Sequence, residues 1–370
     1  MRVGFLTSWA LDDPDSWSGV IRPMYAALDA RTDLVPIPVS VARHHLVDRA
    51  ATRLLGHLGR GYLPEHALAT SRSWAAGATR AVLDADVDVV LSVAASTPLA
   101  YARHGRPVVE VSDSTFGAVT GYYPQFSGLH AVARWQGEAL GRRTSRRAAA
   151  FLLASDWAAR SLVDDYGVDP ARITVAPFGP STTSTTPPQG PRPGEPLRLL
   201  FVGRDWVRKG GERALEIVAD LRRAGVPCEL TVVGTGPSVP SALTEDVHVL
   251  GRVARSAMGD LYAAHDVLLE PARANAGGVT LTDATASGLP VVATRTGGVP
   301  SIVEDGTTGL LVDADDPVAE AVAALGRLAD PDVWRAMSAA GVRRGTDVLS
   351  WERWASTTVQ VCGRVAHSRP

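Results

Sequence analysis

The chain of 370 residues is long for one hydrophobic core, and because domains of about 100 to 200 residues are usual, two domains are expected. Hydrophobic residues make up 45% of it and charged residues 21%, as in a globular protein, and a net charge of −2 disfavours nucleic acid as a partner. The two cysteines have no CxxC or histidine spacing around them, which argues against a disulfide framework and a zinc site.

No stretch of the chain approaches the ~18 consecutive apolar residues of a membrane-spanning helix. The N-terminus turns acidic after a short apolar run, which predicts an opening β-strand and not a signal peptide. A cytoplasmic location is therefore expected.

In both halves of the chain, short β-branched runs alternate with longer stretches of helical period that are rich in alanine, leucine and arginine. This alternation is typical of βα units around a parallel sheet, so each half is expected to be a doubly wound α/β domain. The strands predicted in the first half are 2–6, 34–39, 87–93, 107–111, 149–153 and 173–176. Those predicted in the second half are 197–202, 229–233, 247–250, 267–269, 291–293 and 309–312.

One segment rich in proline and threonine, 180–196, has no hydrophobic periodicity and is predicted to link the two domains. The expected domains are therefore 1–179 and 197–349. The remaining segment, 350–370, is predicted to hold one more helix.

The chain has a single lysine, Lys209, and a single asparagine, Asn275, although lysines and arginines together number 37. Lys209 lies in the segment 199–211, where a buried strand runs into Gly203 and is followed by Arg204, Lys209 and the start of a helix. Two cations at the carboxyl end of a strand, beside the N–H groups of a helix N-terminus, predict a phosphate or diphosphate site. The alternative is an ordinary solvated loop.

Two other nucleotide-binding patterns are incomplete. After the strand 229–233 the chain offers Gly234 and Gly236, but Val239 stands where the dinucleotide fingerprint requires a third glycine. Lys209 is followed by glycine and lacks the frame of the Walker motif. Neither a dehydrogenase nor a P-loop ATPase is supported.

The segment 271–312, PARANAGGVTLTDATASGLPVVATRTGGVPSIVEDGTTGLLV, is the most specific of the chain. Together with GRDWVRKGG and VVGTGP it resembles the donor domain of the family-4 retaining glycosyltransferases, which have the GT-B fold. The resemblance implies two Rossmann-like domains that face a central cleft. The family's E-x7-E positions are Asn275 and Asp283 here, so both glutamates are replaced.

The resemblance implies roles for several residues. Asp283 is expected to accept hydrogen bonds from the nucleotide ribose, and Asn275 to face the donor sugar with a donor and an acceptor but no charge. Other residues are expected to bind the donor, because they are glycines, lie at a helix start or belong to a matching family segment. They are Gly203, Gly234, Arg252, Gly277, Gly278 and Val279. Gly297 and Gly298 are further candidates, although the same residues suit a plain turn.

The N-terminal half is less distinctive. Its first loop, DDPDSWSG, is similar to the family's glycine loop that closes over the diphosphate, with Gly19 as the matching residue. Asp113 stands after the strand 107–111, where many family members have histidine. Its carboxylate can orient an acceptor hydroxyl or the donor sugar, or it can cap the next segment through Ser114 and Thr115.

Two other patterns have a plain structural explanation. Asp86-Val87-Asp88 and Asp313-Ala314-Asp315 match the DxD of metal-dependent transferases but equally suit loop edges, and no metal is expected. The run GRRTSRR, with Arg142, Arg143, Arg146 and Arg147, suits a solvated helix end better than a membrane-facing patch.

The expected activity is metal-independent transfer of a sugar, with retention of configuration, from a nucleoside diphosphate sugar to a hydroxyl acceptor. UDP and GDP are the expected nucleotides, no other cofactor is expected, and the protein is expected to be a monomer or a homodimer. The alternatives are an epimerase or phosphorylase of the same fold, and an accessory protein that binds a nucleotide sugar without efficient turnover.

Overall fold

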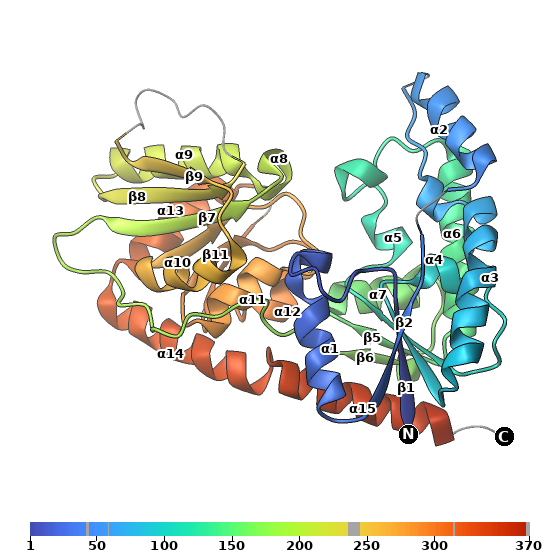
Figure 1. Cartoon of the computed structure of the whole chain (residues 1–370). Helices are drawn as coiled ribbons and strands as arrows, with labels where there is room; N and C mark the ends of the chain where they lie inside the picture. Colours follow the sequence, from blue (N-terminus) through green and yellow to red (C-terminus); the bar gives the residue numbers. More distant parts are fainter. Residues whose placement is uncertain (42–43, 58, 236–244, 314, 368–370) are drawn as a thin grey trace. The chain divides into compact units, whose positions relative to one another are not determined.

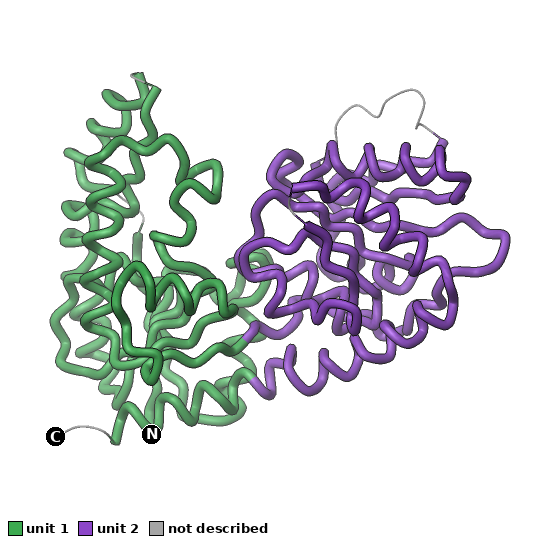
Figure 2. The backbone as a smooth tube through the Cα atoms, turned by 180° about the vertical axis from the view of Figure 1, so that it is seen from behind, with its two compact units in different colours: residues 1–176, 354–370 green, residues 177–353 purple. Residues whose placement is uncertain are grey.

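A computed structural model describes residues 1–41, 44–57, 59–235, 245–313 and 315–367. The chain forms two compact units, which are drawn in different colours in Figure 2. Unit 1 contains Met1–Ala176 and Trp354–Pro370, and unit 2 contains Pro177–Arg353. Residues 180–196, the expected linker, are part of unit 2.

Unit 1 is built on a six-stranded parallel sheet (Figure 1). Its strands are β1 (Arg2–Thr7), β2 (Asp33–Pro38), β3 (Val89–Val93), β4 (Val108–Ser112), β5 (Ala150–Leu153) and β6 (Ile173–Val175), in the order β2-β1-β3-β4-β5-β6. Strand β3, in the middle of the sheet, is buried along its whole length because helices cover both faces. Leu6 packs into the core beneath one helix layer, whereas Phe5 meets Tyr25 of the other layer with ring centroids 5.3 Å apart.

The α-helices of unit 1 connect these strands. They are α1 (Ile21–Asp29), α2 (Leu46–His57), α3 (Leu68–Ala85), α4 (Ser96–Leu99), α5 (Phe116–Val119), α6 (Ala131–Arg147) and α7 (Asp156–Asp164). Short 3₁₀ turns lie at Ser16–Gly19, Pro64–His66, Pro124–Phe126 and Pro170–Arg172. Helices α3, α4 and α6 pack against one another on one side of the sheet (Figure 1).

Unit 2 contains the second six-stranded parallel sheet. Its strands are β7 (Leu197–Gly203), β8 (Cys228–Gly234), β9 (Val247–Gly251), β10 (Val267–Glu270), β11 (Val291–Thr294) and β12 (Gly309–Val312), in the order β12-β11-β10-β7-β8-β9. The first strand of this unit, β7, lies in the middle of the sheet. Strands β8 and β9 follow on one side of β7, and β10, β11 and β12 then follow on its other side. The direction of winding therefore reverses between β7 and β10, which is where ligands of such sheets bind, beyond the carboxyl ends of the strands.

The α-helices of unit 2 form layers on both faces of this sheet. They are α8 (Trp206–Lys209), α9 (Gly211–Arg223), α10 (Met258–Ala264), α11 (Val279–Ala286), α12 (Val299–Ile302), α13 (Pro317–Leu328) and α14 (Pro331–Asp347). Leu199 and Phe201 of β7 pack with α9 and α13, and Leu200 between them packs with α10 and α11, as the alternation of side chains along a strand requires.

The predicted α/β architecture with two Rossmann-like domains is confirmed. All of the predicted strands are present, and their ends differ from the predicted ends by two residues at most. The helix expected near the C-terminus is α15 (Trp351–His367), which begins in unit 2 and contributes its residues from Trp354 onward to unit 1.

Candidate functional site

Two loops meet at the carboxyl ends of β7 and β10. The loop after β7 carries α8, and the loop after β10 runs from Pro271 to the start of α11. The N–H of Arg273 donates to the carbonyl of Arg208 at 2.8 Å, and the Arg208 guanidinium donates to the carbonyl of Ala274 at 3.0 Å. These bonds join the two loops into one wall of the site.

Lys209 is buried at the end of α8 and is paired with a carboxylate. Its Nζ lies 3.0 Å from Oε2 of Glu270, the last residue of β10, and the two residues are 9% and 2% exposed. Gly203 leaves room for this arrangement, because a Cβ there would lie 3.0 Å from both Cβ and Cγ of Lys209. The single lysine of the chain is therefore one half of a buried ion pair.

Asn275 is held from both ends of its amide. Its Nδ2 donates to Oε1 of Glu270, and its Oδ1 accepts the N–H of Gly278 at 3.0 Å. Only this orientation of the amide satisfies both partners, since nitrogen donates and oxygen accepts. Asn275 therefore connects the ion pair to the residue that precedes α11.

Helix α11 begins directly after Gly278, which has a left-handed conformation with φ of 55°. A Cβ at Gly278 would lie 2.3 Å from the Ile302 side chain, so both the backbone and the space at this position favour glycine. Gly277 and Val279 are half-buried on either side of it. The structure thus connects Lys209, Asn275 and Gly278 through Glu270, and Gly277 and Val279 adjoin Gly278 in the chain.

Asp283 lies one turn into α11 and is 3% exposed. Its Oδ1 accepts the N–H groups of Ser181 and Thr182 at 2.6 and 3.4 Å, and its Oδ2 accepts the hydroxyls of Ser181 and Tyr262 at 2.7 and 3.5 Å. A carboxylate has about four acceptor positions, so this set fills them. Burial raises the pKa of Asp283 to about 6, although the bonds from Ser181 oppose the rise.

The remaining predicted donor residues lie on neighbouring loops. Gly234 ends β8, where a Cβ would come within 2.1 Å of the Gly203 carbonyl, so the two strand ends approach closely because both are glycine. Arg204 follows β7 and Arg252 follows β9, and both are exposed. Gly236 lies outside the described residues.

Two predicted residues belong to unit 1. Gly19 ends the 3₁₀ turn Ser16–Gly19 after β1, and the two residues before it, Trp17 and Ser18, have positive φ values of 44° and 61°. Such strained backbone in non-glycine residues is typical of functional loops. Asp113 follows β4 and is half-buried.

The surroundings of Asp113 bear on its alternative role as a cap of the next segment. Ser114 Oγ donates to Asp113 at 3.1 Å, and burial raises the pKa of the carboxyl. The next helix, α5, is capped by Thr115, whose Oγ1 accepts the N–H of Ala118 at 3.0 Å. Thr115 therefore caps α5, and Asp113 accepts the hydroxyl of Ser114 directly before it.

Sequence comparison matches both units to one family. Residues 24–183 match the model "Glycosyltransferase Family 4", and residues 196–330 match "Glycosyl transferases group 1". The two matched ranges cover well over half of the chain. The chain belongs to the family-4 glycosyltransferases.

Curated relatives of this family-4 glycosyltransferase carry the name D-inositol 3-phosphate glycosyltransferase. The protein of Xylanimonas cellulosilytica is 32% identical over 261 residues, which are 64% of this chain and 62% of the relative. That of Acidothermus cellulolyticus is 35% identical over 205 residues, which are 49% of this chain and 46% of the relative. The chain thus spans between about half and three fifths of these relatives' lengths.

Solved structures resemble the whole chain at low sequence identity. Sucrose-phosphate synthase (tll1590) from Thermosynechococcus elongatus has a TM-score of 0.72 with 16% identity and covers 100% of both chains. Anabaena Alr3699/HepE in complex with UDP has a TM-score of 0.68 with 15% identity and covers 98% of this chain and 100% of its own. These similarities show the GT-B fold.

Three residues of the candidate site escaped the sequence analysis: Glu270, Ser181 and Tyr262. Glu270 has a visible signal, because it is an acid at the end of the apolar run VLL and directly before a proline. Ser181 and Tyr262 have none, since both are ordinary residues far from Asp283 in the chain. Their part in the site depends on tertiary contacts alone.

Among the described residues, no group of three or more histidine, cysteine, aspartate or glutamate side chains could hold a metal ion. Asp88 accepts the backbone N–H of Arg2 at 2.8 Å and Asp86 pairs with Arg106 at 3.2 Å, so this DxD stabilises a surface loop. Ala314 of the second DxD lies outside the described residues. No described helix is long and apolar enough to cross a membrane.

Proposed function

We propose that this protein transfers a sugar from a nucleoside diphosphate sugar to a hydroxyl acceptor, without a metal and with retention of configuration. The observation that carries the proposal is the buried Lys209–Glu270–Asn275 chain beside the start of α11, at the reversal point of a Rossmann-like sheet. The relatives' name favours glycosyl transfer, and the crystal structures of HepE with UDP and with UDP-glucose favour a UDP-sugar as donor.

Lys209 and Arg204 are proposed to stabilise the leaving diphosphate. An ammonium group has three N–H donors, so Lys209 can keep its pairing with Glu270 and still donate to phosphate oxygens. Negative charge grows on the diphosphate as the glycosidic bond breaks, and fixed cations then stabilise the transition state more than the bound donor. N–H groups at the start of α11 add to this field.

Asn275 is proposed to act by positioning. Its amide fixes both the Glu270 carboxylate and the N–H of Gly278, so it sets where the first turn of α11 lies. The charge that the family motif places at position 275 is replaced by the neighbouring carboxylate of Glu270. We assign to Glu270 the orientation of Lys209 toward the donor phosphates.

Transfer with retention needs no dedicated base in this scheme, because the leaving phosphate oxygen takes the proton of the acceptor hydroxyl on the same face of the sugar. Asp113 is proposed to orient that hydroxyl. The hydrogen bond from Ser114 fixes one carboxylate oxygen, and the carboxylate has further acceptor positions for that hydroxyl.

The test measures acceptor-dependent release of UDP from UDP-glucose in the presence of EDTA, with a panel of hydroxyl acceptors that includes inositol phosphate. NMR of the product reports the anomeric configuration. We expect release to require acceptor, to survive EDTA, and to give a product with the donor's configuration. An inverted product, or activity lost with EDTA and restored by a divalent cation, contradicts the mechanism.

One observation favours a second function, that of a nucleotide-sugar-binding accessory protein: the Asp283 carboxylate is already occupied by Ser181, Thr182 and Tyr262. Tight binding of UDP-glucose without turnover on any acceptor supports that function. Conversion of the sugar in the absence of acceptor instead indicates an epimerase.

A further inference from the structure

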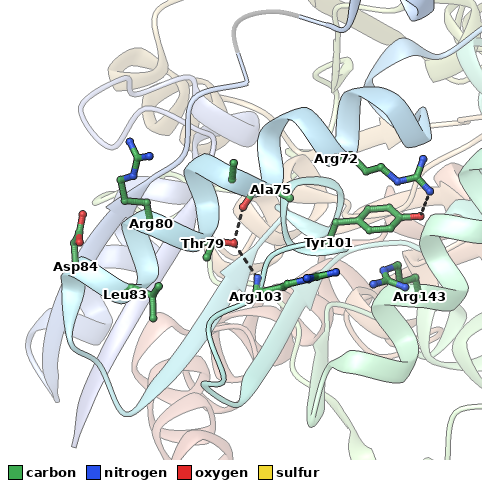
Figure 3. Close-up of a pocket in the computed structure, with 10 residues that line it drawn as sticks. Arg72, Ala75, Thr79, Arg80, Leu83, Asp84, Tyr101, Arg103 and Arg143 are labelled. Carbon is green, nitrogen blue, oxygen red and sulfur yellow. Dashed lines mark hydrogen bonds between the residues drawn. The ribbon is translucent and has the colours of Figure 1, made fainter.

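Unit 1 contains a pocket of about 690 Å³ that is lined by none of the residues proposed for transfer. Arg72 of α3, Arg103 of the segment after α4, and Arg143 of α6 line it together with Tyr101 (Figure 3). Arg103 precedes the first residue of β4, whereas Asp113 follows the last. The pocket runs along α3 from Arg72 to Asp84, and Asp113 does not line it.

Tyr101 arranges two of these arginines. The guanidinium carbon of Arg72 lies 4.6 Å from the centre of the Tyr101 ring, and that of Arg143 lies 4.2 Å from it. Arg72 also donates to the Tyr101 hydroxyl at 3.2 Å, and Arg143 donates through Nε to the carbonyl of Ala100 at 2.6 Å. Cation–π contacts and hydrogen bonds thus hold two like charges beside one ring.

The third arginine is placed by its backbone. The N–H of Arg103 donates to Oγ1 of Thr79 at 2.9 Å, and Figure 3 shows its side chain extending toward Arg143. Within the part of the chain that the structure describes, Arg72, Arg103 and Arg143 have no carboxylate within 4.0 Å. Burial, and then the charges of Arg143 and Arg103, lower the pKa of the neighbouring Arg147. Arg80 and Asp84 also line the pocket, so its wall carries four arginines and one aspartate and is net positive.

We infer that this pocket binds a soluble phosphate compound, a phosphate ester or a diphosphate with a small organic body. Planar guanidinium groups bind phosphate oxygens in pairs, and three of them suit a ligand with at least two negative charges. The volume exceeds that of a phosphate ion and is typical of small-molecule sites, and Ala75 and Leu83 add apolar wall for the organic part. The inference does not depend on the proposed transferase activity.

The test counts inorganic pyrophosphate ions bound per chain by equilibrium dialysis at low ionic strength. Arg72→Gln/Arg103→Gln is the informative variant, because neither side chain donates to a backbone carbonyl as Arg143 does. Its matched control is Arg146→Gln/Arg160→Gln, which removes two exposed arginines of the same unit that do not line the pocket. Lys209→Met/Glu270→Leu removes the proposed diphosphate site of unit 2.

We expect two ions on the native chain and on the control, and one on the Lys209→Met/Glu270→Leu variant. The pocket variant should keep one ion and bind the second at least about tenfold more weakly. Loss of all binding in the pocket variant, with no effect of the unit 2 variant, supports the pocket and refutes the proposed donor site. Native-like binding by the pocket variant overturns the inference.

A second measurement tests whether the three arginines bind the phosphate of a lipid headgroup instead of a soluble phosphate compound. Vesicles of phosphatidylcholine and phosphatidylglycerol are sedimented with the native chain and with the pocket variant. We expect the native chain to stay in solution. Sedimentation that depends on Arg72 and Arg103, with pyrophosphate binding unaffected by the same changes, overturns the inference and assigns the three arginines to a membrane surface.

Discussion

At the scale of single residues, the site depends on charges that are taken out of water and partnered. Glu270 and Lys209 form a buried pair, and Asp283 is a buried carboxylate with a complete set of donors. Removing one member of such a set leaves the other without compensation, which costs more than the interaction itself contributes. Each substitution of these residues is therefore compared with a second variant, so that its effect on stability can be told apart from its effect on function.

Lys209→Met is expected to lower the free energy of unfolding by about 3 to 5 kcal/mol, because Glu270 is left buried and unpaired. Lys209→Met/Glu270→Leu should recover most of this loss, since no buried charge remains. Turnover should stay at least ~100-fold below native in both variants, as the cation at the diphosphate is missing. Denaturant unfolding and UDP release measure the two effects. Native-like turnover in the double variant removes Lys209 from the mechanism.

Binding of UDP-glucose should weaken as the pH falls through about 6, because Asp283 becomes protonated there and stops accepting from the ribose. The pKa is raised in the folded state, so Asp283 contributes to stability below its unfolded pKa of 3.8, and this contribution is lost as the pH rises through about 6. Asp283→Asn should flatten the pH dependence of binding between pH 5 and 7. Calorimetric titration with the intact nucleotide sugar avoids the second phosphate ionisation of UDP, near pH ~6.

Ser181→Ala should tighten UDP-glucose binding by about fivefold, because a ribose hydroxyl must displace the Ser181 hydroxyl from Asp283 and one hydrogen bond is worth about 1 kcal/mol. Ser184→Ala is the matched control, since Ser184 donates to the carbonyl of Thr186 and does not touch Asp283. Weaker binding by Ser181→Ala than by the control means that the serine hydroxyl helps to bind the nucleotide and does not compete with it.

At the scale of elements, glycines determine how closely the loops after the strands approach one another. Gly210 joins α8 to α9 with a φ of 77°, and a Cβ there would lie 2.0 Å from the carbonyl of Pro271. This approach holds the end of α8 against the loop after β10, and it therefore places Lys209 beside Glu270.

Gly210→Ala is expected to destabilise the protein by clearly more than Gly225→Ala. Gly225 has the same φ of 77° but nothing within 4 Å of the added Cβ, so it reports the backbone cost of about 1 kcal/mol alone. The clash with Pro271 should add to this cost and should also weaken UDP-glucose binding. Thermal unfolding and calorimetry measure both. Equal effects of the two substitutions would show that the loops adjust freely.

At the scale of the whole molecule, the C-terminal helix connects the two units through the chain itself. Helix α15 begins at Trp351 in unit 2, and from Trp354 onward it supplies core residues to unit 1. Trp354 is 1% exposed and is among the largest fully buried side chains. Unit 1 therefore includes buried side chains from the C-terminal segment as well as from residues 1–176.

Trp354→Ala is expected to lower the free energy of unfolding by about 3 to 5 kcal/mol, the usual cost of the cavity left by a large aromatic side chain. Arg353→Ala, the adjacent exposed position, should change it by less than about 0.5 kcal/mol. Denaturant unfolding distinguishes them. A small effect of Trp354→Ala would mean that α15 is peripheral to the core of unit 1.

Much of the fold was predictable from the sequence, because each strand is a short β-branched run between helical stretches and parallel pairing makes such runs apolar throughout. The positions of Lys209, Asn275, Gly278 and Asp283 beyond strand ends were predictable for the same reason. Glu270, Ser181 and Tyr262 were not predicted, because Glu270 was assigned to no element and the other two reach Asp283 only through the folding of distant segments.

By itself, the sequence determined the two α/β halves and the family and gave candidate residues for a diphosphate site, since periodicity and local motifs are properties of neighbours along the chain. Only the tertiary structure decided the partners: that Lys209 pairs with Glu270, that Asn275 fixes the start of α11, and that Arg72 and Arg143 lie over Tyr101 in a pocket that Arg103 also lines. The physical reason is that electrostatic and hydrogen-bond energies depend on distances and burial, which are set when segments far apart in the sequence pack together.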